Sequence, residues 1–290
     1  MTSLIFGCGY LGSRVAERRR QAGHVVRIVS RSSAKAAEFR AQGYEAVTAD
    51  VTNPESLTSD AIWRDVKTVL FAVGFDRTSG KSIEEVYVGG VANVLRHCPR
   101  DARFVYVSST GVYGASGGEW IDEDTPCKPQ RDGGKACLAA ENLLREDAVG
   151  PRTIILRLGG IYGPIRLPRI QDLIACRPIT AAEDGWLNLI HVDDAARIVL
   201  DAADRSETPA LFTVTDGRPV QRRDFYREAA RLLGTPPPRF EEPSADLAPL
   251  TRGGSDKRVS NRRLVAALEP QFQFPSYREG LINILTSGRT

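Results

Sequence analysis

The chain has 290 residues, 42% of them hydrophobic, which is enough for one large or two unequal domains with a well-buried core. Lysine and arginine number 39 against 36 acidic residues, and a net charge of +3 gives no reason to expect a nucleic-acid partner or a membrane surface. Five cysteines without metal-type spacing, and no apolar stretch near the length of a membrane span, favour a cytoplasmic protein with reduced thiols and no metal.

The first residues predict a β-strand, a glycine turn and a helix. An apolar run from Leu4 leads into residues 7–12, a G-x-G-x-x-G pattern, and a helix is expected over residues 13–22. Gly7 permits the tight turn, Gly9 lets the backbone approach a pyrophosphate, and Gly12 lets the helix lie close to the strand. The pattern therefore predicts a dinucleotide site that also includes Tyr10 and Leu11. An ordinary glycine turn of another α/β protein is the alternative.

The residues after the second strand favour NADP over NAD. Gly23 ends the helix, and residues 24–29 form an apolar run that completes a β-α-β unit. The next residues, Ser30, Arg31 and Ser32, include no carboxylate that could accept hydrogen bonds from a ribose with two hydroxyls. Arg31 offers a charged fork suited to a phosphate, and the two serines add donors. A solvated loop arginine is the alternative for Arg31.

Further strands predict a Rossmann-type α/β fold with a doubly wound parallel sheet. Strands are expected over residues 46–51, 68–74, 104–108 and 154–158, with a long helix over 134–146. Ligands bind beyond the carboxyl ends of such strands. The cofactor contacts expected there come from the ends of the third and fourth strands: Asp50, Val51, Ala72, Val73 and Gly74.

Prolines break this rhythm after residue 163, which predicts a smaller, discontinuous C-terminal substrate domain. Residues 187–192 resemble a strand that returns to the sheet. The predicted NADP-binding domain is therefore 1–162 plus about 187–215. The substrate-side domain is about 163–186 plus 216–290.

Four further stretches resemble, with the glycine turn, the extended short-chain dehydrogenase/reductase family of NAD(P)-dependent epimerases and dehydratases, and particularly its atypical bacterial branch. They are residues 107–114, 156–164, 188–196 and 257–263. In this family a serine or threonine, a tyrosine, and a lysine four residues after the tyrosine perform the chemistry. The resemblance implies that Ser109 hydrogen-bonds the reacting oxygen and that Lys135 holds the nicotinamide ribose.

Arg131 stands four residues before Lys135, where the family has tyrosine. A guanidinium with a pKa above about 12 cannot act as a general acid or base near neutral pH. Tyr113, Tyr162, a bound water or a substrate group could replace the missing phenol. Arg131 itself could bind a carboxylate or phosphate, or it could be a solvated arginine on its loop. A second departure is Tyr87, where relatives usually have asparagine.

Other prominent residues have structural roles in this interpretation. His191 is expected to be buried and hydrogen-bonded, and Asp193 or Asp194 to cap the next helix. Cys8 is expected to pack rather than to sense redox state. The acidic stretch 119–124 is either a solvated face or, by the resemblance, part of a substrate-adjacent loop.

Two functions remain open. The first is an NADP-dependent oxidoreductase or epimerase/dehydratase-like enzyme for a small hydroxyl, carbonyl or nucleotide-sugar-like substrate, in which the usual catalytic tyrosine is missing. The alternative is a catalytically silent NADP-binding sensor or protein-interaction module. Analogy with relatives also suggests a homodimer, with no nucleic-acid or membrane partner.

Overall fold

The computed structural model describes residues 1–242 and 256–286, and the chain divides into two compact units. Unit 1 comprises Met1–Val112, Asp132–Arg157 and Ala196–Phe212. Unit 2 comprises Tyr113–Arg131, Leu158–Ala195 and the described residues from Thr213 onward. The sequence-based division assigns residues 113–131, 158–162, 187–195 and 213–215 to the cofactor domain, whereas these residues cluster with unit 2 in the structure.

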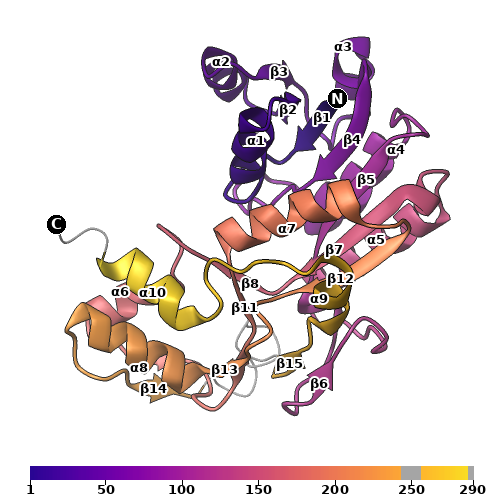
Figure 1. Ribbon diagram of the computed structural model, residues 1–290. Helices are drawn as coiled ribbons and strands as arrows, with labels where there is room; N and C mark the ends of the chain where they lie inside the picture. The colour runs from indigo at the N-terminus through magenta and orange to yellow at the C-terminus, as the bar shows by residue number, and fades with distance from the viewer. Residues whose placement is uncertain (243–255, 287–290) are drawn as a thin grey trace. The chain divides into compact units, whose positions relative to one another are not determined.

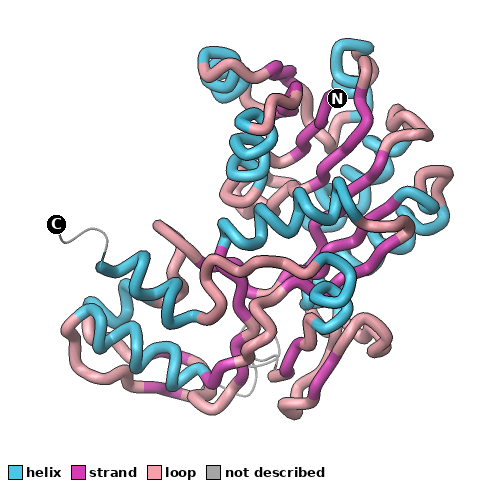
Figure 2. Tube along the Cα trace, in the orientation of Figure 1, coloured by secondary structure: helices cyan, strands magenta, loops and turns pink. Residues whose placement is uncertain are grey.

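The largest sheet in the described part of the chain has seven strands in the order β12-β7-β5-β4-β1-β2-β3 (Figures 1 and 2). The strands are β1 (Thr2–Phe6), β2 (Val25–Ser30), β3 (Glu45–Thr48), β4 (Val66–Phe71), β5 (Arg103–Ser109), β7 (Thr153–Leu158) and β12 (Ala210–Val214). From β3 to β5 each neighbouring pair is parallel, and the chain order reverses on either side of β1. The predicted doubly wound Rossmann-type sheet is thus confirmed.

Alternation along β1 explains how unit 1 is layered. Leu4 and Phe6 point into a buried cluster with residues of α4 (Gly90–Leu95) and α5 (Asp132–Glu146). Ser3 and Ile5 point to the opposite face, where they line a small pocket with side chains of α1 (Gly12–Gln21) and of the C-terminal half of α7 (Val192–Arg205). Because successive strand residues face opposite sides, one apolar run supplies both layers.

The remaining elements of unit 1 connect the strands, and those of unit 2 are short strands and helices. Those of unit 1 are α2 (Ser33–Ala41), η1 (Pro54–Leu57), α3 (Asp60–Trp63), η2 (Glu85–Gly89), η3 (Thr110–Val112) and η4 (Gly150–Arg152). The strands of unit 2 are β6 (Trp120–Ile121), β8 (Gly160–Tyr162), β9 (Ile179–Thr180), β10 (Trp186–Leu187), β11 (Leu189–His191), β13 (Val220–Gln221), β14 (Phe240–Glu241) and β15 (Arg258–Val259). Its other helices are α6 (Ile170–Ile174), α8 (Arg222–Leu233), α9 (Arg262–Leu268) and α10 (Tyr277–Thr286).

The expected return of residues 187–192 to the large sheet is wrong. Leu187 belongs to β10, which pairs with β13, and β11 pairs in parallel with β8 as a separate two-stranded sheet. The strand that joins the large sheet is β12, after α7. Asn188 separates β10 from β11, because its side-chain amide is bonded to the backbone on both sides of Arg258.

Unit 2 has a hydrophobic core of its own. It gathers buried side chains from β8, β11, α8 and α10, with Tyr162 and Phe225 among the largest. Gly280 in α10 allows the closest approach, since a Cβ there would lie 2.1 Å from the Tyr162 hydroxyl oxygen.

Candidate functional site

The glycine turn between β1 and α1 has the geometry that its three glycines predict. Gly7 has a φ of +90°, and a Cβ there would lie 2.4 Å from the backbone of Ala72. A Cβ on Gly12 would lie 2.2 Å from the Gly7 carbonyl oxygen, so α1 starts against the turn. At Gly9 a Cβ would meet no atom within 4 Å. The fold itself therefore needs Gly7 and Gly12, whereas Gly9 leaves open space beside the N-terminus of α1, which fits a pyrophosphate.

The non-glycine side chains of the turn are held by local packing contacts. Burial raises the pKa of the Cys8 thiol to about 12, which disfavours the reactive thiolate and agrees with a packing role. The Arg14 guanidinium lies 4.5 Å from the Tyr10 ring centre and donates to the Tyr10 carbonyl at 2.8 Å. Leu11 is buried immediately before α1. These contacts pack the side chains of the loop against the start of α1.

Arg31, the predicted phosphate-binding residue, lies at the end of β2 and is paired with Asp76 in the loop after β4. Both side chains are exposed, and hydrogen bonds from Thr78, followed by the Arg31 contact, lower the pKa of Asp76 to about 2. The Ser32 hydroxyl caps α2 by accepting from the Lys35 N–H. The Ser30 hydroxyl donates to the Ser32 carbonyl. All three predicted residues therefore form one polar corner, with Asp76 as its unforeseen member.

The ends of β3 and β4 contribute the other predicted cofactor residues. The expected third strand stops at Thr48, because the Asp50 carboxylate turns the chain by accepting from the backbone N–H and the hydroxyl of Thr52. Val51 is buried and accepts a hydrogen bond from Asn93 at its carbonyl. These contacts place Asp50 and Val51 in a turn instead of a strand.

The expected fourth strand ends at Phe71, so Ala72, Val73 and Gly74 leave the sheet as a loop. The hydroxyl of Tyr87 accepts a hydrogen bond from the Phe75 N–H at 3.2 Å. The tyrosine that departs from the family pattern thus anchors this loop.

Ser109 and Lys135 both belong to unit 1. Ser109 ends β5, and its hydroxyl accepts from the Gly111 N–H at 3.0 Å. Lys135 lies in the first turn of α5 with its side chain 61% exposed and 3.8 Å from Asp132. Their elements are joined by the fully buried carboxylate of Glu141 in α5, which accepts from Ser108 in β5.

The Glu141 carboxylate is held by two arginines as well. Arg157 of β7 donates to both of its oxygens at 3.0 and 2.7 Å, and Arg145 donates to one at 2.9 Å. A buried carboxylate needs such compensation. This network fixes α5, and with it Lys135, against β5 and β7.

Tyr113 and Arg131 belong to unit 2, where they bound one loop. Arg131 precedes the first residue of α5 and is therefore outside the helix. The loop closes on itself, because a Cβ on Gly114 would lie 2.0 Å from the Lys128 carbonyl oxygen. Tyr113 is buried, and its carbonyl accepts a hydrogen bond at 3.5 Å from Lys257.

Lys257 is a residue that the sequence analysis did not single out. It immediately precedes β15 and is 4% exposed. Burial, and then the nearby charge of Arg131, lower its pKa to about 8. The sequence signal was present in the family-like stretch 257–263, but nothing in that stretch predicts burial of its lysine.

The expected burial of His191 is supported, and the expected cap of α7 is corrected. His191 is buried, with its ring 3.8 Å from that of Phe274, and it accepts the Asp193 N–H at Nδ1. Neither aspartate caps α7, because both lie inside its first turn; the Asp194 carboxylate instead accepts two backbone N–H groups, those of residues 273 and 274. Tyr162, considered as a substitute acid, is fully buried and donates to the Ser276 carbonyl, and burial raises the pKa of its phenol.

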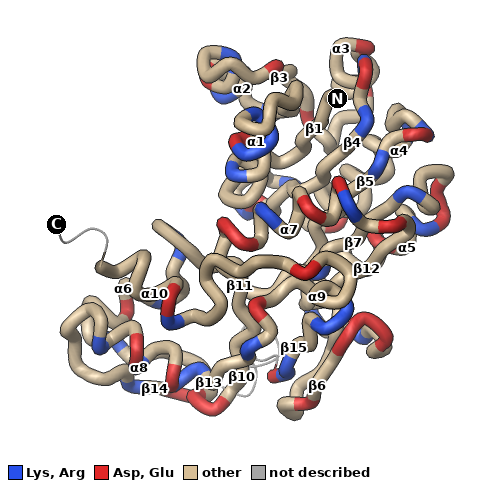
Figure 3. The backbone as a smooth tube through the Cα atoms, viewed as in Figure 1, with Lys and Arg blue, Asp and Glu red and all other residues tan. Residues whose placement is uncertain are grey.

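The acidic stretch 119–124 includes β6 (Figure 3). It is not uniformly solvated. Glu123 is 8% exposed and accepts from the backbone N–H and the hydroxyl of Thr213 at 2.7 and 2.8 Å. Asp124 is exposed and pairs with Arg263 at 2.6 Å. This part of the stretch fastens the loop to its unit.

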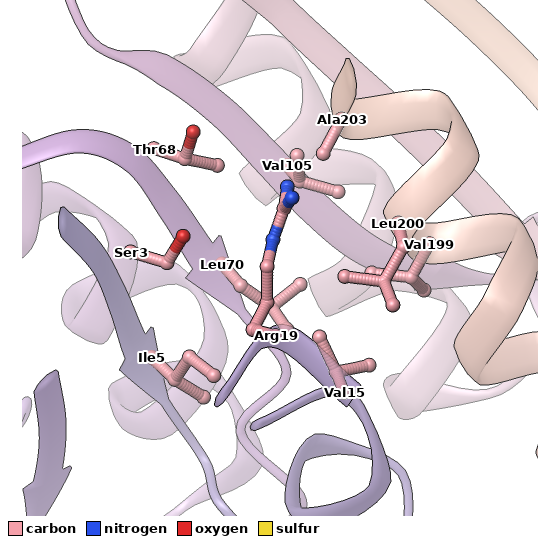
Figure 4. A pocket seen from close by; sticks show the side chains of 10 residues that line it. All are labelled: Ser3, Ile5, Val15, Arg19, Thr68, Leu70, Val105, Val199, Leu200 and Ala203. Atoms are coloured by element: carbon pink, nitrogen blue, oxygen red, sulfur yellow. The ribbon is translucent and has the colours of Figure 1, made fainter. Parts of the chain in front are cut away.

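The pocket between α1, α7 and the sheet contains none of these candidate residues (Figure 4). The Arg19 side chain extends through it, and its guanidinium forms two hydrogen bonds with Asp204 at 2.6 and 2.7 Å. The cavity is about 10 Å³, room for about one water molecule. It is therefore a packing gap and not a substrate site.

The model of the NAD dependent epimerase/dehydratase family matches residues 4–214. The chain belongs to this family. Protein YeeZ of Escherichia coli strain K12 is 30% identical over 185 residues, which make up 64% of this chain and 62% of YeeZ, so less than two thirds of that relative is matched.

Solved structures agree on the fold. A functionally unknown conserved protein from Silicibacter pomeroyi is 27% identical, with a TM-score of 0.77 over 100% of this chain and 99% of that one. UDP-glucose 4-epimerase from Thermus thermophilus, solved with NAD, has a TM-score of 0.78 at 20% identity, covering 100% of this chain and 99% of its own. The latter likeness shows the fold alone. None of the helices within residues 1–242 and 256–286 has the length and apolar character needed to cross a membrane.

Proposed function

We propose that this member of the family is an NADP(H)-dependent oxidoreductase or epimerase/dehydratase-like enzyme for a small hydroxyl, carbonyl or nucleotide-sugar-like substrate. The observation that carries the proposal is the glycine turn, which is closed by backbone contacts at Gly7 and Gly12 and open at Gly9. A packing requirement explains the first two glycines and leaves the third unexplained. Room for a pyrophosphate beside the start of α1 explains it.

Ser109 and Lys135 are the proposed catalytic residues of unit 1. A nicotinamide dinucleotide, when bound, supplies the hydride donor or acceptor. The Ser109 hydroxyl would donate to the reacting oxygen, and the exposed Lys135 ammonium would hold the ribose. Arg131 takes the place of the family tyrosine in this proposal and cannot transfer the proton. That step would then fall to Tyr113, to water or to a substrate group.

The preference for NADP rests on Arg31. Its guanidinium would bind the 2′-phosphate after exchanging the Asp76 carboxylate for it. Exposed ion pairs contribute little stability, so this exchange is feasible.

Binding measurements test both parts. Dissociation constants for NADPH and NADH are compared for wild type, for Arg31→Ala and for Arg40→Ala, a control that removes the same charge from α2. Arg31→Ala should weaken NADPH binding about tenfold or more while leaving NADH unchanged. Equal effects on both cofactors would remove the NADP assignment. Gly9→Val should fold as wild type yet bind neither cofactor, and unchanged binding by this variant would overturn the dinucleotide site itself.

A second candidate function is a catalytically silent NADP-binding sensor. It is favoured by Arg131, which replaces the family tyrosine four residues before Lys135 and cannot transfer a proton. Ser109→Ala distinguishes the two. Loss of NADPH-dependent turnover in this variant supports the enzyme, whereas cofactor-dependent association with a partner that persists in the variant supports the sensor. A homodimer, proposed by analogy with relatives, is tested by light scattering of the purified chain.

A further inference from the structure

Unit 2 contains a buried ammonium with few partners. Lys257 is 4% exposed, although an ammonium has three N–H groups to satisfy. One hydrogen bond is described for it, to the Tyr113 carbonyl, and at 3.5 Å this bond is long. Lysine is rarely buried unless it is paired with an anion.

Among the residues that the structure describes, the charges that act on Lys257 do not compensate its own. Arg131 is close enough that its charge disfavours the protonated ammonium. Glu119 acts in the opposite sense but is the smallest of the three influences, and its carboxylate also accepts from the Gly117 N–H at 2.7 Å. Two cations are therefore held near each other while one of them is buried.

The position of Lys257 is fixed on both sides. The Asn188 side chain donates to the Lys257 carbonyl at 2.8 Å and accepts from the Val259 N–H at 2.7 Å. The Asp256 carboxylate accepts from the Trp186 N–H at 2.8 Å, and β15 pairs with β6. Such bonds make it costly for the segment to turn the ammonium toward water. They are the kind of support that holds a binding residue in place.

We propose that Lys257 and Arg131 form a binding site for an anionic group, a carboxylate or a phosphate, of the small-molecule substrate. An oxyanion placed between the two side chains would accept the hydrogen bonds that the Lys257 ammonium lacks and would neutralise the repulsion between the two cations. The substrate part of this inference rests on the proposed function. The anion site itself does not, because it lies within unit 2 and needs no cofactor.

NMR of the apoprotein tests the site directly. The chain has six lysines, so labelling with [ε-13C]lysine gives six signals, of which Lys257→Arg identifies one. Sodium phosphate and sodium malonate are each titrated in, with sodium chloride at matched ionic strength as control. We expect phosphate or malonate to raise the pKa of Lys257 by about one unit or more, which is tenfold tighter binding to the charged form, and we expect no such effect in Arg131→Gln.

The anion that gives the larger rise identifies the group as a phosphate or a carboxylate. The same rise with chloride would show screening only and would overturn the site, as would an unmoved Lys257 signal with both anions. Lys128→Met, an exposed lysine on the same loop as Arg131, should respond as wild type.

Turnover tests the link to the substrate. NADPH-dependent reduction of a panel of 2-oxo acids is compared with that of the corresponding neutral amides. Arg131→Gln and Lys257→Met should raise KM for the acids tenfold or more and leave the amides unchanged. Equal effects on both would overturn the substrate assignment. If none of these compounds turns over, 2-oxo acids are excluded as the substrate class, while the NMR result still decides the anion site.

Discussion

Replacing Lys257 by methionine should stabilise the protein in the absence of ligand. Methionine keeps an unbranched apolar side chain in the buried space and removes the ammonium. In the folded chain, burial and then Arg131 lower the pKa of Lys257 from 10.5 to about 8. Folding therefore opposes the protonation of this group, and the protonated form is the one present at neutral pH.

The size and sign follow from linkage between protonation and folding. The pKa difference, 10.5 minus about 8, is about 2.5 units, and at about 1.4 kcal/mol per unit the charged lysine costs about 3 kcal/mol of folding free energy. Between pH 8 and 10.5 the unfolded chain holds a proton that the folded chain has released, so wild-type stability rises with pH in this range. The penalty is complete below about pH 8 and is lost at about pH 10.5.

Urea unfolding of wild type, Lys257→Met and the control Lys128→Met in chloride buffer measures this difference. Lys257→Met should be more stable than wild type by about 3 kcal/mol at about pH 7, and the gap should close toward about pH 10. A variant that is less stable than wild type, by an amount that does not change with pH, would refute the reasoning. Lys257 would then be a structural donor to the Tyr113 carbonyl.

Three other predictions concern charges elsewhere in the chain. Burial raises the pKa of Asp216 to about 7, and its Oδ2 has no hydrogen-bond partner among the residues that the structure describes. Wild type should therefore lose stability relative to Asp216→Asn as the pH rises from about 4 to about 7. In urea unfolding above pH 7 the variant should be more stable than wild type by about 2–4 kcal/mol, and a pH-independent difference would contradict the prediction. Arg157→Leu should lower the free energy of unfolding by about 3–5 kcal/mol, because it removes two hydrogen bonds from the buried Glu141 carboxylate. If adding Glu141→Gln restores part of this loss, the uncompensated charge is the cause. Asp76→Asn should tighten NADPH binding a few-fold, since Arg31 loses a competing carboxylate; weaker binding in fluorescence titration would show that Asp76 instead orients the arginine.

The fold was largely predictable from the sequence because its signals are local. Apolar runs of strand length, each followed by a helical pattern, identify a parallel sheet without knowledge of which strands are neighbours. The three glycine roles were likewise readable, since each depends on backbone within one turn. The predicted third and fourth strands extend too far, because apolar residues continue past the ends of β3 and β4. The Asp50 turn and the loop after Phe71 end the strand pairing earlier.

The candidate site was less predictable, because its electrostatics depend on residues that are distant in sequence. Arg31 meets Asp76, which lies 45 positions away, and Lys257 meets the Tyr113 carbonyl, 144 positions away. No spacing rule connects such pairs. The prediction that residues 187–192 return to the large sheet is wrong for a similar reason. The side chain of Asn188 is bonded to the segment around β15, which is distant in the sequence.

Glu141 and Lys257 are both buried and charged, but they differ in how far the surrounding residues compensate the charge. The Glu141 carboxylate is buried in unit 1 and accepts hydrogen bonds from Ser108, Arg145 and Arg157. The fold itself therefore compensates its charge. Lys257 is nearly as buried but has one long hydrogen bond and a neighbouring cation. A fold gains nothing from the second arrangement, since an apolar side chain of similar size would avoid the cost. The buried Lys257 ammonium is explained if a bound ligand supplies the compensating negative charge. The lysine NMR titration with phosphate and malonate measures this effect.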